Sequence, residues 1–139
     1  MQAIAAKLLV LGMGGTIAGR SQVPGDNVGY RAGEVAVEAL LPSATSELAR
    51  LHGCQIETLQ IAQIDSKDMD HAVWFALADA VLAAYSDAAV VGIVITHGTD
   101  TLEETAFFLA QLCQPPKPVV LTCAMRPATS SSPDGPQNV

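Results

Sequence analysis

Aromatic and basic residues are both scarce in this chain of 139 residues. Phe, Trp and Tyr make up 4% of it, and 7 Lys and Arg residues stand against 14 Asp and Glu residues, for a formal net charge of −7 at pH 7. An acidic protein is repelled at long range by a nucleic-acid backbone or an anionic membrane, so neither is expected as a partner. No segment approaches the run of about eighteen apolar residues that crosses a membrane. A small polar metabolite is the expected partner.

Cysteine is also rare, and Cys54, Cys113 and Cys123 lie far apart in the sequence. An odd number of cysteines without Cys-x-x-Cys or metal-ligand spacing indicates reduced thiols rather than disulfides or a metal centre. Residues 1–7 lack the basic segment and long apolar stretch of a secretory signal. We therefore expect a cytoplasmic protein, with neither a metal nor another cofactor.

The apolar residues are mainly Ala, Val, Leu and Ile, which suits the layers of a single α/β domain. Nearly continuous apolar runs predict buried parallel strands, and apolar residues at three- and four-residue spacing predict helices. The expected strands are residues 8–11, 90–96 and 119–123, from such runs, and residues 55–61, from alternation of apolar and polar residues. The expected helices are residues 34–41, ended by Pro42, then 69–84 and 101–113, with a further segment at 43–51.

The ends of these elements carry capping signals. Ser66 and Asp68 stand where the 69–84 helix is expected to begin, and Thr101 with Glu104 forms a capping box at the start of the next helix. Residues 126–139 hold several Pro, Ser and Thr residues and show no face that would pack.

Short connections between alternating strands and helices predict a doubly wound, mainly parallel, flavodoxin-like sheet with helices on both faces, a three-layer α/β fold. Ligands of such sheets bind beyond the carboxyl ends of the strands, where the strand order reverses. If the first strand lies between the second and third, the turns that follow these strands flank one crevice.

The turns at this expected crevice carry hydroxyl groups. Glycines at positions 12, 14 and 15 let the backbone take positive φ and let another group approach closely, so Thr16 can be aimed into a cleft. A threonine hydroxyl becomes a nucleophile when a base takes its proton, and backbone donors of a glycine turn can hold an oxyanion. Asp100 can bind an ammonium or orient a proton carrier, and Ser66 can bind a carboxylate. The long, turn-rich segment 20–31 predicts a lid.

Four segments spread over almost the whole chain carry specific motifs. They are Gly14-Gly15-Thr16-Ile17-Ala18-Gly19, Ser66-x-Asp68-Met69, Thr96-His97-Gly98-Thr99-Asp100-Thr101-x-Glu103-Glu104-Thr105-Ala106 and Ala124-Met125-Arg126-Pro127-x-x-Ser130-x-Ser132-x-Asp134-Gly135-Pro136-x-Asn138. In this order the motifs resemble the bacterial-type L-asparaginase (asparaginase/glutaminase) family, in its N-terminal domain. The resemblance implies an L-asparagine amidohydrolase, with L-glutamine as a further possible substrate.

The resemblance also implies a catalytic set. Thr16 would attack the side-chain amide of L-asparagine, and water would hydrolyse the β-aspartyl-enzyme to L-aspartate. Tyr30 would hydrogen-bond the nucleophile, and Thr99 would position the water or assist proton transfer. Ser66 would hold the substrate carboxylate and Asp100 its ammonium.

Two further positions are assigned through the resemblance. Ala124 would line the pocket through its backbone. Lys67 stands where the family commonly has a substrate-contacting glutamine. A lysine there can pair with the substrate carboxylate, and the alternative is a solvated surface lysine.

By the same resemblance, residues 1–139 form an incomplete, truncated N-terminal domain. The family's smaller C-terminal domain, and a lysine that assists Thr99 and Asp100, would lie beyond Val139. A homo-oligomer, dimer or tetramer, is implied for the full-length form.

Two other classes of function stay open. A phosphate- or nucleotide-binding flavodoxin-like module would use the same glycine turn, but the third glycine of the dinucleotide fingerprint is Ile17 here and no acidic residue ends the second strand. A non-catalytic truncated fragment is the other alternative. His97 is interpreted as a structural histidine at a strand end, bonded to backbone, rather than as a general base.

Overall fold

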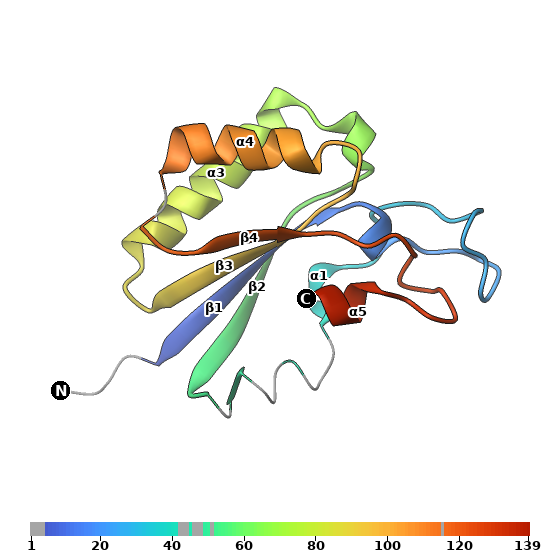
Figure 1. Ribbon diagram of the computed structural model, residues 1–139, viewed down its shortest axis with the longest axis horizontal. Coiled ribbons are helices and arrows are strands. Elements are labelled where there is room, and N and C mark those ends of the chain that lie inside the picture. The colour runs from blue at the N-terminus through green and yellow to red at the C-terminus, as the bar shows by residue number, and fades with distance from the viewer. Residues whose placement is uncertain (1–4, 42–44, 46–48, 51, 115) are drawn as a thin grey trace.

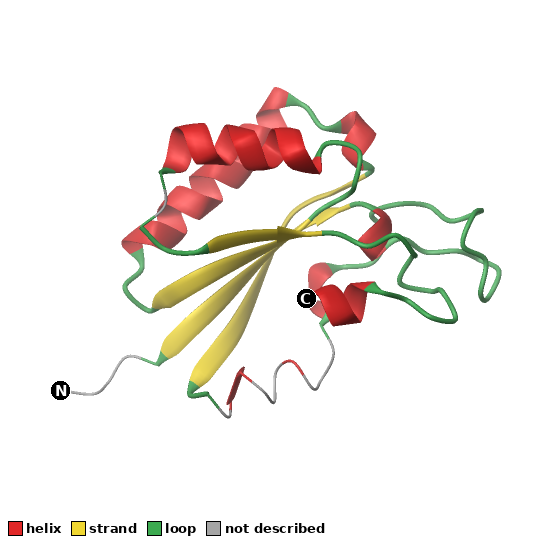
Figure 2. Cartoon of the chain, in the orientation of Figure 1, coloured by secondary structure: helices red, strands yellow, loops and turns green. Residues whose placement is uncertain are grey.

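A computed structural model describes residues 5–41, 45, 49–50, 52–114 and 116–139 of the chain. It contains one four-stranded parallel sheet in the order β2-β1-β3-β4 (Figures 1 and 2). The strands are β1 (Ala6–Gly14), β2 (Cys54–Ile64), β3 (Val90–Thr96) and β4 (Val119–Thr122). The first strand does lie between the second and third, which was the condition for a shared crevice, so the strand order reverses at β1.

The helices lie on both faces of the sheet, as predicted (Figure 1). Two long helices, α3 (His71–Ser86) and α4 (Leu102–Cys113), cover one face. The short helices α1 (Val37–Leu40) and α5 (Gly135–Asn138) lie on the other. The larger hydrophobic core lies between the sheet and α3 and α4, and its buried members are Leu9, Leu11, Met13, Leu77, Ala78, Val81, Ala84, Val90, Ile93, Ile95, Leu109 and Cys113.

Two capping predictions were wrong. The residue that caps α3 is Asp70, whose carboxylate accepts a hydrogen bond from the backbone N–H of Val73. Ser66 instead begins a separate 3-10 turn, η2 (Ser66–Asp68). Thr101 does precede α4, but its hydroxyl donates to the carbonyl of Ser66 at 2.9 Å and caps no N–H of the helix. In both places the hydroxyl that was predicted to cap a helix instead makes a hydrogen bond to a residue distant in the sequence.

The C-terminal segment also differs from expectation, because it packs. The Asp134 carboxylate accepts hydrogen bonds from the backbone N–H groups of Met125 and Arg126, both at 2.9 Å. Ser130 is buried, and the Asn138 amide donates to the Cys123 carbonyl. Together with the apolar packing of Ala128 and Val139 against the buried cluster that contains Ile17 and Ala124, these polar contacts hold the segment on the domain.

The first helix is shorter than the predicted 34–41, and Pro42, with most of the 43–51 segment, lies outside the described residues. Strand β2 is longer than predicted, running to Ile64 and so up to the start of η2. Among the residues that the structure describes, no helix is long and apolar enough to cross a membrane.

Candidate active site

The turns after three neighbouring strands meet at the carboxyl edge of the sheet. Gly14 and Gly15, at the end of β1, have φ values of 98° and 76°, which other residues rarely adopt. A Cβ atom on Gly15 would lie 2.3 Å from the Cα of Gly98, in the turn after β3. A Cβ on Gly14 would lie 2.5 Å from the carbonyl oxygen of Ile64, at the end of β2. The glycine turn therefore provides the predicted close approach between loops.

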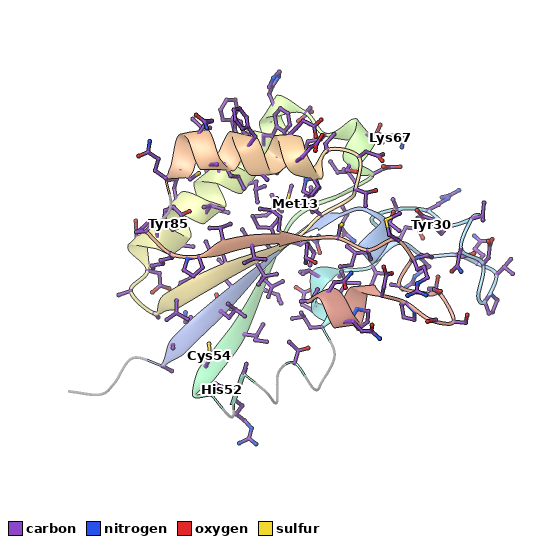
Figure 3. The ribbon with its side chains drawn as sticks, viewed as in Figure 1. Met13, Tyr30, His52, Cys54, Lys67 and Tyr85 are labelled. Carbon is purple, nitrogen blue, oxygen red and sulfur yellow. The ribbon has the colours of Figure 1, made fainter. Side chains whose placement is uncertain are left out.

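A polar cavity of about 280 Å³ opens at this meeting point. Its lining comes from the turn after β1, the segment leading into α1, the end of β2 and the turn after β3. The lining residues are Thr16, Val28, Tyr30, Ala32, Asp65, Ser66, Thr99 and Asp100. Figure 3 places Tyr30 and Lys67 at this end of the sheet, opposite to His52 and Cys54. The prediction that these turns flank one crevice is confirmed.

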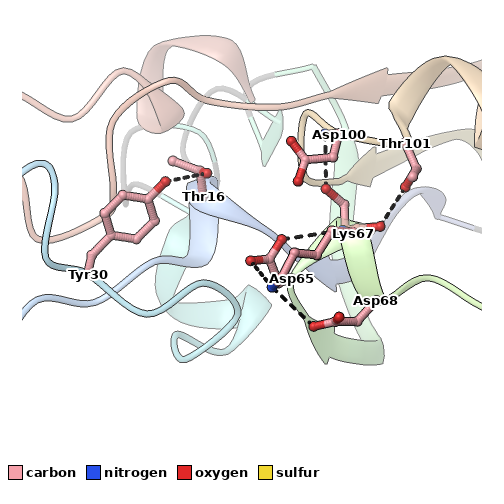
Figure 4. A network of polar contacts seen from close by, with 8 residues as sticks. Thr16, Tyr30, Asp65, Lys67, Asp68, Asp100 and Thr101 are labelled. Atoms are coloured by element: carbon pink, nitrogen blue, oxygen red, sulfur yellow. Dashed lines mark hydrogen bonds and ion pairs between the residues drawn. The ribbon is translucent and has the colours of Figure 1, made fainter.

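Thr16 and Tyr30 form one side of the cavity. The Thr16 Oγ1 and Tyr30 hydroxyl oxygens are 2.8 Å apart, in hydrogen-bond contact (Figure 4). Tyr30 reaches this position because Arg20 and Arg31 exchange two backbone hydrogen bonds of 2.9 Å, which close the 20–31 segment into a loop. A short antiparallel bridge at the base of the loop thus brings the phenol to the threonine.

Ser66 and Asp100 form the other side. Ser66 is 3% exposed, and its Oγ accepts a hydrogen bond of 3.0 Å from the backbone N–H of Asp100. Since the Asp100 N–H supplies that proton, the serine hydroxyl keeps its own proton for another acceptor. The Asp100 carboxylate is exposed and lines the cavity. The pair thus presents one hydroxyl donor and one anion.

Lys67 points to two neighbouring carboxylates. Its Nζ lies 2.6 Å from Asp65 and 3.3 Å from Asp68, and its side chain is 60% exposed (Figure 4). The hydrogen bond between Lys67 and Asp65 raises the pKa of the lysine and lowers the pKa of the Asp65 carboxyl. Lys67 does not line the cavity, whereas Asp65 does. Asp65 was not among the predicted site residues, and the expectation that no acidic residue ends the second strand was wrong: β2 runs past residue 61 to Ile64, and Asp65 follows it directly. An acidic residue directly before Ser66 was a usable signal.

Two other predicted positions lie away from the cavity lining. Ala124 is 1% exposed and packs in a second hydrophobic cluster with Ile17 and Ala18. His97 is fully buried, and its Nδ1 lies 2.8 Å from the carbonyl oxygen of Gly98. Burial lowers the pKa of His97, which favours the neutral ring. The predicted hydrogen bond between this histidine and the backbone is confirmed.

The lining residues are suited to a small zwitterion. The cavity holds hydroxyl groups and two carboxylates, and among its described lining residues there is no lysine or arginine. A phosphate would be repelled by Asp65 and Asp100, which disfavours the nucleotide-binding alternative. Over the described part of the chain, no group of three or more His, Cys, Asp or Glu side chains could hold a metal ion. The available chemistry is a hydroxyl nucleophile beside a phenol, facing a carboxylate and a serine.

Known proteins are similar to this chain in sequence and in fold. The family model described as "Asparaginase, N-terminal" matches residues 7–139. A probable periplasmic L-asparaginase of Haemophilus influenzae is 45% identical over 132 residues, 95% of this chain and 36% of that protein. A glutaminase-asparaginase of Acinetobacter glutaminasificans is 40% identical over 134 residues, 95% of this chain and 39% of that protein.

Among solved structures, a probable cytoplasmic L-asparaginase of Campylobacter jejuni superimposes with a TM-score of 0.85. It is 41% identical, and the match covers 96% of this chain and 39% of that one. The chain thus spans a little over a third of the length of these relatives.

Proposed function

The chain belongs to the asparaginase family, and from that premise we propose that the protein hydrolyses the side-chain amide of L-asparagine to L-aspartate and ammonia, with Thr16 as the nucleophile. The observation that carries the proposal is the 2.8 Å contact between the Thr16 and Tyr30 hydroxyl oxygens at the wall of a polar cavity. The opposite wall holds a serine hydroxyl and the Asp100 carboxylate. A nucleophile and two groups for an amino acid backbone therefore face the same small volume.

Substrate orientation follows from the charges of the cavity. The Asp100 carboxylate attracts the substrate α-ammonium, and the Ser66 hydroxyl donates to the α-carboxylate. Lys67 belongs to this proposal through its ion pair with Asp65: the lysine charge offsets one of the two cavity carboxylates that would repel the substrate carboxylate. With the α-ammonium and α-carboxylate of the substrate held in this way, its side-chain amide extends toward Thr16.

The reaction proceeds as two acyl transfers. Thr16 Oγ1 attacks the amide carbon and gives up its proton through the Tyr30 hydroxyl. The C–N bond breaks, the nitrogen takes a proton, and ammonia leaves a β-aspartyl ester on Thr16. Water, positioned by Thr99, then attacks the ester carbon, its proton returns to the threonine oxygen, and L-aspartate leaves. The proposed role of Ala124, to line the pocket through its backbone, would be played from the buried cluster that it shares with Ile17 and Ala18.

The wider assignments rest on the relatives. We propose that L-glutamine is a further substrate, since a relative is named glutaminase-asparaginase. We also propose a cytoplasmic location, for which the Campylobacter neighbour gives support, while the Haemophilus relative is named periplasmic. Residues 1–139 correspond in this proposal to the family's N-terminal domain, and the full-length form is a homo-oligomer that size-exclusion chromatography with light scattering would reveal.

The function is tested by substituting the nucleophile. Thr16→Ala should abolish ammonia release from L-asparagine, whereas Thr16→Ser, which keeps a hydroxyl, should retain part of it. Thr58→Ala is the matched control, because Thr58 bonds Glu38 at the protein surface and lies outside the cavity. Ammonia release by Thr16→Ala at the level of Thr58→Ala would refute the role of Thr16.

A further inference from the structure

A buried chain of hydrogen bonds leads from α3 to the turn that carries Thr99 and Asp100. Trp74 Nε1 lies 2.8 Å from Thr105 Oγ1, and Thr105 Oγ1 lies 3.0 Å from His97 Nε2. The other ring nitrogen of His97 lies 2.8 Å from the Gly98 carbonyl oxygen. Thr105 and His97 are both fully buried, so water cannot substitute for these partners.

The direction of each hydrogen bond follows from the groups involved. The Trp74 indole N–H can only donate, and the Gly98 carbonyl can only accept. His97 therefore carries its proton on Nδ1, and in the neutral ring Nε2 accepts from the Thr105 hydroxyl. The Thr105 oxygen accepts from Trp74 in turn. In this arrangement Trp74 Nε1, Thr105 Oγ1 and both ring nitrogens of His97 each have a partner, and Thr105 must both accept and donate, which its hydroxyl does.

The hydrogen-bonded series ends at Gly98, which has no side chain to fix its position. A Cβ on Gly98 would lie 2.4 Å from Ser66 Oγ and 3.1 Å from the Cα of Gly15. Gly98 is thus pressed between two other loops of the cavity and precedes Thr99 and Asp100 directly. The orientation of its peptide group decides where those two residues point, and His97 is the side chain that fixes its carbonyl.

We propose that Thr105 is a positioning residue that acts through His97: its hydroxyl holds the imidazole so that Nδ1–H fixes the Gly98 carbonyl and presents Thr99 and Asp100 to the cavity. This inference rests on the proposed function for the roles of Thr99 and Asp100, but the geometry that it describes does not. The lowered pKa of the buried His97 is consistent with the neutral ring that the arrangement needs.

Three variants test the proposal. Thr105→Val keeps the shape of the side chain and removes the hydroxyl, and Thr105→Ser restores the hydroxyl. Leu109→Val is the control for lost packing, because Leu109 is buried on α4 one turn further on and belongs to the larger core. Thr105→Val should weaken L-aspartate binding, measured by calorimetry, by about tenfold, since two buried partners lose their hydrogen bond. Thr105→Ser and Leu109→Val should stay within about threefold of the parent. Equal weakening by Thr105→Val and Leu109→Val would overturn the proposal.

Nuclear magnetic resonance separates this inference from the proposed function. The ¹⁵N shifts of the His97 ring should show a proton on Nδ1 and an accepting Nε2 in the parent. The backbone amide signals of Gly98, Thr99 and Asp100 should move in Thr105→Val and return in Thr105→Ser. If the parent neither binds L-aspartate nor releases ammonia, the proposed function fails while these signals still decide the role of Thr105. Unchanged amide signals of Gly98, Thr99 and Asp100 in Thr105→Val would overturn the positioning role of Thr105.

Discussion

Substituting Gly98 by alanine should disrupt the site through a single added methyl group. The new Cβ would lie 2.4 Å from Ser66 Oγ and 2.6 Å from Ser66 Cβ, against an ordinary contact of 3.4 Å or more. Ser66 must therefore move by about 3.4 − 2.4 = 1.0 Å. It cannot do so without losing the hydrogen bond that it accepts from the Asp100 N–H.

The size of the effect follows from two terms. Overpacking of a close contact costs about 1–3 kcal/mol, and the lost hydrogen bond adds about 0.5–1.5 kcal/mol. We expect Gly98→Ala to lower the free energy of unfolding by about 2–4 kcal/mol. L-aspartate binding should fall with it, because the displaced serine hydroxyl belongs to the cavity.

Gly92→Ala is the matched control, on the same strand-and-turn segment. Neither Gly92 nor Gly98 has a positive φ. A Cβ on Gly92 would first meet the flexible end of Leu8 at 3.3 Å, so its effect should stay within about 1 kcal/mol. Urea denaturation and calorimetry measure both quantities. Equal stability and equal binding in the two variants would refute the contact between the Gly98 turn and Ser66.

Three other predictions concern charge and hydroxyl groups at or behind the cavity. Tyr30→Phe removes the partner of the Thr16 hydroxyl and should lower kcat at least about a hundredfold with little change in unfolding free energy; a kcat near the parent value would exclude the phenol from proton transfer. Lys67→Ala should raise KM for L-asparagine several-fold, because Asp65 is left uncompensated at the cavity, whereas Asp68→Asn should not. Burial lowers the pKa of His97 in the folded protein below its unfolded value of about 6.5. Between pH 7 and pH 5 the unfolded chain therefore binds more protons than the folded protein does. The free energy of unfolding should fall by up to about 2 kcal/mol over this range. Urea denaturation at both pH values checks this, and His97→Asn should show a smaller fall; an equal fall would contradict the assignment.

The sequence is sufficient to predict the sheet and the place of the site, because both depend on local pattern. The apolar runs that became β1 and β3 are short, nearly continuous and followed by glycine-containing turns, a pattern typical of buried parallel strands. The glycines before Thr16 and the hydroxyl-rich turn after β3 identify the loops that meet. Parallel strands place such turns on the same edge, so the location of the cavity follows from topology.

The remaining features depend on contacts between distant residues, which local pattern does not encode. Ser66 and Thr101 have the sequence pattern of helix caps. In the structure the Ser66 Oγ accepts from the Asp100 N–H, and the Thr101 hydroxyl donates to the Ser66 carbonyl. Asp134 folds the C-terminal segment back through backbone N–H groups nine and eight residues away. The short 3-10 turn η2 also could not be predicted from local pattern. It directs Asp65 to the cavity and Lys67 to the Asp65 carboxylate, whereas a regular helix would place these side chains differently.

The most direct test of the nucleophile is the identity of the residue that carries the acyl group. The purified protein is mixed with L-asparagine, quenched in acid within one turnover, digested and analysed by mass spectrometry. We predict an aspartyl ester on the peptide that contains Thr16, at the Thr16 oxygen, and no such ester in Thr16→Ala. An ester on another residue, such as Thr99, or ammonia release from Thr16→Ala, would contradict the proposed mechanism.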